Sequence, residues 1–123
     1  MPKRMMVVDD DRVSRTFMKK VLEAKGYEVE AAEDGLDALA KVVSFEPDII
    51  ILDIMMPEVN GYDVCYQLRF NKKYEQIPIV LVTARDAELD NSIGERVNIE
   101  YLHKPVNPTL LLDKVERLLL RLS

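Results

Sequence analysis

The chain has 123 residues, of which 48% are hydrophobic, so it is long enough to bury one compact core. Its 22 acidic residues outnumber 17 basic ones, and a formal charge of -5 argues against direct binding to nucleic acid. The single cysteine, Cys65, excludes an internal disulfide, and the first apolar run is too short for a signal peptide or a membrane span. We therefore expect one cytoplasmic domain over residues 1–123 that binds neither nucleic acid nor membranes.

Short apolar runs alternate with helical patterns from the N-terminus onward. A first strand is predicted at residues 5–8, and the helix after it carries an apolar stripe of Val13, Phe17, Val21 and Ala24. A short strand at residues 28–32 then leads to a helix that ends before Pro47, because proline disfavours a helical residue ahead of it.

The same alternation continues through the second half of the chain. Strands are predicted at residues 48–53, 77–82 and 99–102, and helices at residues 61–69, 86–96 and 108–122. The helix at 86–96 is the weakest on propensity, because it contains Asn91, Ser92 and Gly94. Five repeats of strand and helix with tight connections predict an α/β fold in which a parallel sheet is covered on both faces.

Chemistry-bearing side chains follow four of the apolar runs. Asp9-Asp10-Asp11 follow the first strand, Asp53 the third, Thr83 the fourth and Lys104 the fifth. Because parallel strands end at the same edge of a sheet, we expect these side chains to converge there. A carboxylate nucleophile, acids that bind a divalent metal, a hydroxyl and an ammonium are the components of a phosphoryl-transfer site.

This ordered set resembles the receiver domain of bacterial two-component response regulators, of which the chemotaxis regulator is an example. The resemblance covers residues 4–121 and rests on four motifs: Val7-Val8-Asp9-Asp10, Leu52-Asp53-Ile54-Met55-Met56-Pro57 with Asn60-Gly61, Val82-Thr83-Ala84, and Tyr101-Leu102-His103-Lys104-Pro105. It implies a flavodoxin-like fold, a five-stranded parallel doubly wound sheet with strand order 2-1-3-4-5.

By the same resemblance, Asp53 accepts a phosphoryl group from a histidine kinase, a phosphotransfer protein or a small acyl phosphate. Mg²⁺ would be held by Asp9, Asp10, Asp53 and the backbone carbonyl of Met55, and three neighbouring carboxylates do require a cation. No turnover substrate is expected, since the domain would catalyse only its own phosphorylation and dephosphorylation.

The resemblance also implies a switch. Lys104 and Thr83 would bind phosphoryl oxygens, and the inward movement of Thr83 would let Tyr101 turn in. The signal would leave through the face of helix 4 (residues 86–96), strand 5 (residues 99–102) and helix 5 (residues 108–122), toward an output domain or protein or a second copy of the chain. In the family, Met55 and Arg85 occupy the positions that flank the approach of the hydrolytic water.

The last helix carries more leucines than one core contact needs. Leu111, Val115, Leu118 and Leu122 form one stripe at about 100° per residue. We expect Leu119 to widen that buried face, and Leu112 with Leu120 to form a partner surface.

An alternative from another class uses different acids. Asp9-Asp10-Asp11-Arg12-Val13 contains the spacing Asp-x-Asp-x-Val, which resembles haloacid-dehalogenase-like phosphatases, with Asp9 as nucleophile and Asp11 as acid/base. That interpretation leaves Asp53 unexplained and finds no second acid pair after Lys104. Asp11 is also a favoured residue for capping the helix that follows.

Overall fold

The computed structural model describes residues 2–84 and 98–122, which form one parallel sheet flanked by helices. The strands are β1 (Arg4–Val8), β2 (Glu28–Ala32), β3 (Ile49–Asp53), β4 (Ile79–Thr83) and β5 (Ile99–His103). The helices in the described residues are α1 (Arg12–Ala24), α2 (Gly35–Phe45), α3 (Gly61–Arg69) and α5 (Pro108–Leu122). The strand order β2-β1-β3-β4-β5 confirms the predicted doubly wound topology. The helix predicted at 86–96 lies outside the described residues.

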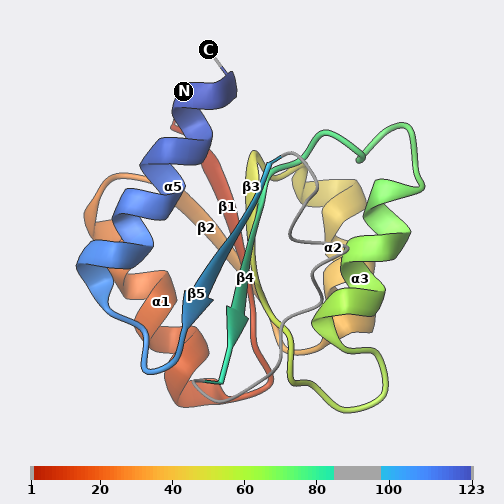
Figure 1. The fold of residues 1–123 in the computed structure, drawn as a ribbon, viewed down its shortest axis with the longest axis horizontal. Helices are drawn as coiled ribbons and strands as arrows, with labels where there is room; N and C mark the ends of the chain where they lie inside the picture. Colours follow the sequence, from red (N-terminus) through yellow and green to blue (C-terminus); the bar gives the residue numbers. More distant parts are fainter. Residues whose placement is uncertain (1, 85–97, 123) are drawn as a thin grey trace.

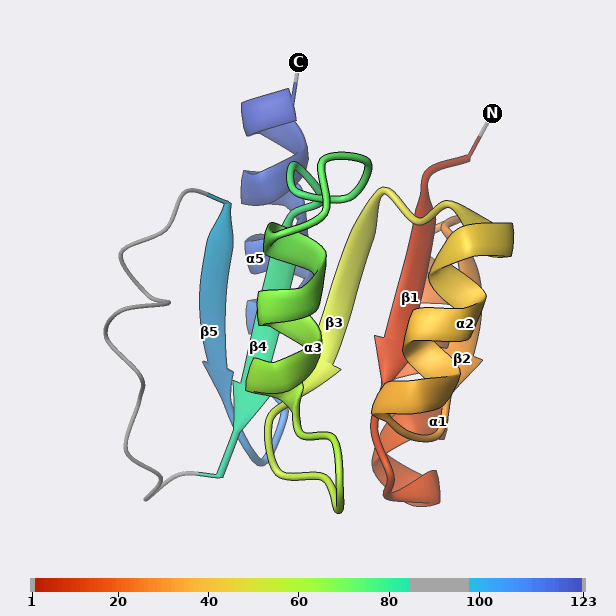
Figure 2. The same ribbon diagram turned by 90° about the vertical axis from the view of Figure 1, so that its right-hand side faces the viewer.

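The sheet is covered on both faces, α1 and α5 lying on one side and α2 and α3 on the other (Figures 1 and 2). Alternate side chains of each strand enter opposite cores, since successive residues of a strand point to opposite faces. The core beneath α2 and α3 includes Met6, Val8, Ile50 and Leu52. The core beneath α1 and α5 includes Met5, Val7, Ile49 and Ile51. This double burial explains why the central strands are continuously apolar in sequence.

The predicted stripe on the first helix is correct only at Val21, which packs against the core beneath α1 and α5, whereas Val13, Phe17 and Ala24 are exposed. In α1, Val13 is 77% exposed and Phe17 is 42% exposed, whereas Met18 and Leu22 are fully buried. Met18 and Leu22 continue a stripe that begins one turn earlier with the half-buried, polar Ser14, so this stripe is less conspicuous in the sequence than the neighbouring apolar one. None of the described helices is long and apolar enough to cross a membrane.

The last helix confirms its predicted bounds and most of its predicted core face. Leu111, Val115 and Leu118 are fully buried, and Leu119 packs against the same core. Leu112 also packs against that core but is only partly buried, so its assignment to a partner surface stays a prediction. The sheet below α5 is broad enough to bury leucines on the flank of the central stripe as well as on the stripe itself.

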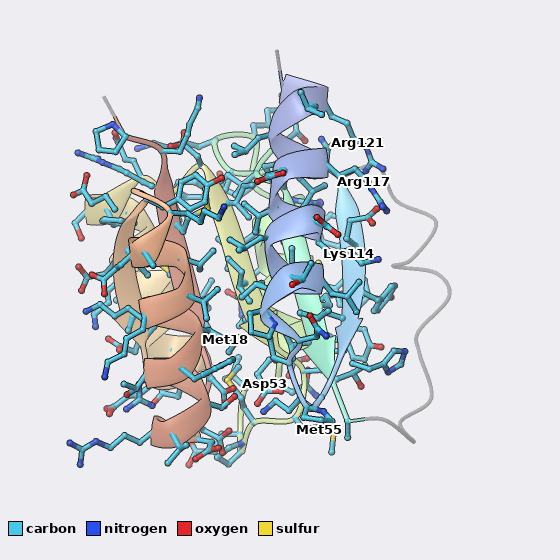
Figure 3. The ribbon with its side chains drawn as sticks, turned by 90° about the vertical axis from the view of Figure 1, so that its left-hand side faces the viewer. Met18, Asp53, Met55, Lys114, Arg117 and Arg121 are labelled. Carbon is cyan, nitrogen blue, oxygen red and sulfur yellow. The ribbon has the colours of Figure 1, made fainter. Side chains whose placement is uncertain are left out.

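One carboxylate on β5, that of Glu100, forms ion pairs with three cationic side chains of α5. These side chains, Lys114, Arg117 and Arg121, are labelled in Figure 3. Glu100 lies 3.5 Å from Lys114 Nζ, 3.1 Å from Arg117 Nη1 and 3.3 Å from Arg121 Nη2. Only 14% of the Glu100 side chain is exposed, so these ion pairs attach α5 to the edge strand at a site with limited solvent screening.

Helix α3 begins directly against the end of β3. Its N-cap is Asn60, whose side chain accepts from the Asp63 amide while the Asp63 side chain accepts from the Asn60 amide, a capping box. The next residue, Gly61, donates its amide to the Ile54 carbonyl at 3.0 Å. The start of α3 therefore packs on the backbone that presents Asp53.

We expect Gly61→Ala to destabilise the protein by at least about 2 kcal/mol, because a side chain there overpacks the strand end. A Cβ atom would lie 2.7 Å from Ile54 Cα and would collide with the Asp53 carbonyl, both of them backbone atoms. Urea unfolding measures the loss. The control is Gly26→Ala, where φ is +90° but no atom lies within 4 Å of the added Cβ, and where about 1 kcal/mol is expected. Equal losses in the two variants would contradict the packing argument.

Candidate functional site

The predicted site residues meet at the edge where all the strands end, the lower edge in Figure 2. Val8 pairs with Leu52 in the β1–β3 ladder, so Asp9 and Asp53 follow neighbouring strands side by side. Asp53 and Met55 are labelled at this edge in Figure 3. The β4–β5 ladder ends with Thr83 opposite His103, which places Lys104 just beyond Thr83.

Three carboxylates form a cluster suited to a metal ion. Asp9, Asp10 and Asp53 each offer one oxygen, and these oxygens all lie within 4.8 Å of one another. Asp9 and Asp53 are buried, whereas Asp10 is exposed at the rim. An all-oxygen set with one side open to water fits a hard divalent cation such as Mg²⁺, which keeps several water ligands. The described residues of the cluster include no cysteine or histidine that would favour zinc.

The burial of Asp53 makes its negative charge costly. Desolvation raises the pKa of Asp53 to about 7, and the neighbouring Asp9 charge acts in the same direction. Lys104 and the Met55 amide, which donates to Asp53 Oδ1 at 3.3 Å, oppose the increase but do not cancel it. A cation bound among the three acids would relieve this cost, which supports the metal assignment.

Lys104 bridges the two buried acids. Its Nζ lies 3.1 Å from Asp9 Oδ2 and 3.5 Å from Asp53 Oδ2. Burial alone would lower the pKa of this lysine, but its hydrogen bond to Asp9 and the negative charge of Asp53 outweigh burial and raise it. The ammonium is therefore held charged next to the oxygen atoms of Asp53.

Thr83 is fully buried beside the acids, and its hydroxyl donates to the Ala84 carbonyl at 3.4 Å. The Thr83 carbonyl accepts from the Lys104 amide at 2.7 Å, which ties together the ends of β4 and β5. Tyr101 lies partly buried on β5 and packs against the core on the α2 and α3 side. The switch roles of Thr83 and Tyr101 and the metal-ligand role of the Met55 carbonyl stay predictions.

The structure adds one residue that the sequence interpretation missed. Arg15, on α1, donates from Nη1 to the backbone carbonyl of Asp9 at 2.8 Å. The only signal in the sequence is a cation one turn inside a helix that follows an acid pair, and many helices share that pattern. His103 is exposed and Cys65 is buried in the core, as expected for residues without a role in this chemistry.

Residues 5–116 match the family model of the response regulator receiver domain. The chain therefore belongs to the response regulator receiver domain family, a class of signalling domains. Its fold is that of this family, and the resemblance seen in the sequence is confirmed.

Several relatives share this domain. Response regulator MprA from Mycobacterium sp. (strain KMS) is 40% identical over 124 residues, which cover 100% of this chain and 53% of that protein. The alkaline phosphatase synthesis transcriptional regulatory protein PhoP from Bacillus subtilis (strain 168) is 38% identical over 122 residues, 98% of this chain and 50% of that protein. The chain thus spans about half the length of these relatives.

Solved structures agree with the fold. Chemotaxis protein CheY4 from Vibrio cholerae superposes with a TM-score of 0.86 at 32% identity, over 96% of this chain and 99% of that one. A CheY-like receiver domain protein from Methanospirillum hungatei JF-1 gives a TM-score of 0.84 at 33% identity, over 96% of this chain and 94% of that one.

The phosphatase alternative receives no support from the family match or from the geometry. Asp11 is the N-cap of α1, and its side chain accepts from the Val13 amide at 3.3 Å. Its own amide donates to Asp9 Oδ1 at 2.9 Å, so the backbone of Asp11 fixes the supposed nucleophile. A capping role accounts for Asp11 without assigning it proton transfer.

Proposed function

We propose that this chain is a phosphorylation-dependent switch whose phosphoacceptor is Asp53. The observation that carries the assignment is the position of the Asp53 carboxylate, which is buried, next to the Lys104 ammonium and within the metal-binding cluster. The second buried acid, Asp9, is already engaged by Lys104 and by the Asp11 amide. Labelling with acetyl phosphate and Mg²⁺, followed by location of the labelled residue, tests the proposal.

In the proposed reaction, an Asp53 carboxylate oxygen attacks the phosphorus of a histidine kinase phosphohistidine or of an acyl phosphate, and the bond from phosphorus to the donor breaks. Mg²⁺ supplies charge neutralisation and orientation of the phosphoryl oxygens when bound, with Asp9, Asp10, Asp53 and the Met55 carbonyl as its ligands. Lys104 provides a fixed positive charge beside the accepting oxygen. The product is an acyl phosphate on Asp53, and hydrolysis of that bond resets the domain.

Thr83 and Tyr101 are proposed to transmit the change. The Thr83 hydroxyl and the Lys104 ammonium would both bind phosphoryl oxygens. Because the Lys104 amide donates a hydrogen bond to the Thr83 carbonyl, the ends of β4 and β5 would respond together to phosphorylation. Tyr101 lies partly buried on β5, the edge strand, so a change in its packing would alter the surface of that strand. Coupling between phosphorylation and the packing of Tyr101 needs only a modest free-energy difference between the two packing states of the domain.

The proposed partners are a sensor histidine kinase or phosphotransfer protein, and an output protein or domain. A homodimer through the face formed by the helix predicted at 86–96, β5 and α5 remains part of the proposal, with Leu110 and Leu120 exposed on α5. We place the domain, residues 1–123, in the cytoplasm, since its one cysteine is buried and reduced. Apart from its own phosphorylation and dephosphorylation, no catalysed reaction is proposed.

We expect the phosphoryl group on Asp53 to persist, and Met55→Asn to shorten its lifetime severalfold. Met55 is 64% exposed at the rim of the site, and its thioether is a poor hydrogen-bond partner for an attacking water. An asparagine there could orient that water. Loss of ³²P after removal of the donor measures the lifetime. Val43→Asn, at an exposed apolar position on α2, is the control, and an unchanged lifetime in Met55→Asn would contradict the idea. Arg85, the other flanking residue, lies outside the described residues.

A further inference from the structure

Arg15 connects the first helix to the acid pair. Its backbone amide donates to the carbonyl of Asp11, the N-cap of α1, at 2.9 Å, which fixes its place in the first turn. Helix side chains lean toward the helix N-terminus, so a long side chain at this position extends back past the cap. Its Nη1 donates to the Asp9 carbonyl at 2.8 Å. The guanidinium therefore binds the peptide group that joins Asp9 to Asp10.

This contact completes the restraint of Asp9. The Asp9 amide donates to the Ala32 carbonyl at 3.2 Å, Oδ1 accepts from the Asp11 amide at 2.9 Å and Oδ2 accepts from Lys104 at 3.1 Å. With Arg15 on its carbonyl, every polar group of Asp9 has a partner. These contacts restrain the Asp9 side chain and the Asp9–Asp10 peptide from which the Asp10 side chain projects.

Asp10 depends on this restraint more than its neighbours do. Asp9 and Asp53 are buried, but Asp10 is exposed, and no hydrogen bond or ion pair within the described part of the chain holds its carboxylate. Its position is therefore set by the backbone on either side. The Asp11 cap fixes one side of Asp10, and Arg15 fixes the other.

The charge of Arg15 would have the opposite effect. A cation close to the acid cluster repels a divalent metal ion, and the positive end of the helix dipole disfavours an arginine in the first turn. When Arg15 is replaced, loss of its contact with the Asp9 carbonyl would weaken metal binding, whereas loss of its positive charge would strengthen it. This opposition makes the role of the residue measurable.

We propose that Arg15 is a positioning residue for the divalent cation, acting through the Asp9–Asp10 peptide. The proposal rests on the proposed function, in which Asp9, Asp10 and Asp53 hold Mg²⁺. Arg15 touches neither the metal ion nor the phosphoryl group. Its effect should appear in metal affinity and not in the rate of the chemical step.

The test is calorimetric titration of the parent and of Arg15→Met with MgCl₂, without a phosphodonor. We expect Arg15→Met to bind Mg²⁺ about tenfold more weakly, the lower end of the loss when an outer-shell partner of a metal ligand is removed. Unchanged or tighter binding would overturn the proposal, since it would leave only the repulsion by the charge.

Arg4→Met is the matched control. Arg4 also donates from Nη1 to a backbone carbonyl at 2.8 Å, that of Phe45, but it lies at the opposite end of β1. We expect Arg4→Met to lower the midpoint of thermal unfolding while leaving Mg²⁺ affinity within twofold of the parent. If both variants lost Mg²⁺ affinity equally, general loosening of the sheet would explain the result and Arg15 would have no particular role.

Labelling with acetyl phosphate distinguishes an effect on Mg²⁺ affinity from an effect on the rate of phosphoryl transfer. In Arg15→Met, the Mg²⁺ concentration for half-maximal labelling should rise about tenfold, while the rate at saturating Mg²⁺ stays within about twofold of the parent. A lower maximal rate with unchanged half-saturation would overturn the proposal. If the parent itself bound no Mg²⁺, the proposed function would fail, whereas equal Mg²⁺ binding by parent and variant would refute only the role of Arg15.

Discussion

Acetyl phosphate with Mg²⁺ is expected to label the parent with an acid-stable, base-labile acyl phosphate, and Asp53→Asn is expected to abolish the label. Asparagine keeps the size and shape of the side chain but has no nucleophilic carboxylate. It also replaces one of the three carboxylates of the metal cluster with a neutral amide. Incorporation of ³²P, with mass mapping of the labelled peptide, measures the result.

Two further substitutions distinguish the phosphoacceptor from the neighbouring acids. Asp11→Asn keeps a good N-cap and should leave labelling intact, because Asp11 serves α1 and not the reaction. Asp10→Ala should reduce labelling through weaker metal binding, with partial recovery at high Mg²⁺. Label that persisted in Asp53→Asn and vanished in Asp9→Asn would restore the phosphatase interpretation, in which Asp9 is the nucleophile.

In the metal-free protein, the charge of buried Asp53 is expected to cost more stability as the pH rises, and Asp53→Asn is expected to remove that cost. The pKa of Asp53 is raised from 3.8 in the unfolded chain to about 7 in the folded protein, chiefly by burial. Asp53 therefore does not destabilise the folded protein at a pH below its unfolded-state pKa. Its destabilising effect grows as the pH rises and levels off above its folded-state pKa. Between pH 5 and pH 8, the stability of Asp53→Asn relative to the parent should rise by on the order of 2 kcal/mol.

Urea unfolding in EDTA at a series of pH values measures this difference, and only its change with pH is used, because asparagine also differs from a protonated aspartate. Saturating Mg²⁺ should stabilise the parent at pH 8 and should have much less effect on Asp53→Asn. A difference between the two proteins that stayed constant from pH 5 to pH 8 would show that the charge of Asp53 costs little in the folded state.

The fold was largely predictable because a parallel sheet covered on both faces leaves a strong trace in the sequence. The continuous apolar run before Asp53 is an example of such a trace. The bounds of the last helix were predictable as well. The first helix was less predictable, since Val13 and Phe17 are apolar but exposed, and sequence periodicity does not say which of two adjoining faces meets the sheet. The strand predicted at 77–82 begins at Ile79, because Pro78 has no amide to donate to the ladder.

The candidate site was predictable as a set of strand ends, but not in its supporting contacts. Asp9, Asp53 and Lys104 follow buried strands, and the topology alone brings such positions together. The contact from Arg15 depends on the length and direction of one side chain and on a carbonyl that carries no sequence signature. The raised pKa of Asp53 depends on how fully the site excludes water, which requires coordinates.

The ion pairs on α5 have an electrostatic consequence for the outer surface of the domain. The protein has a formal charge of -5, yet Lys114, Arg117 and Arg121 place three positive charges along one side of a single helix. Glu100 is the carboxylate that these three share. A neutral glutamine at that position would leave a cationic row on an otherwise acidic protein, so one side chain determines how strongly positive the potential over the β5–α5 surface is.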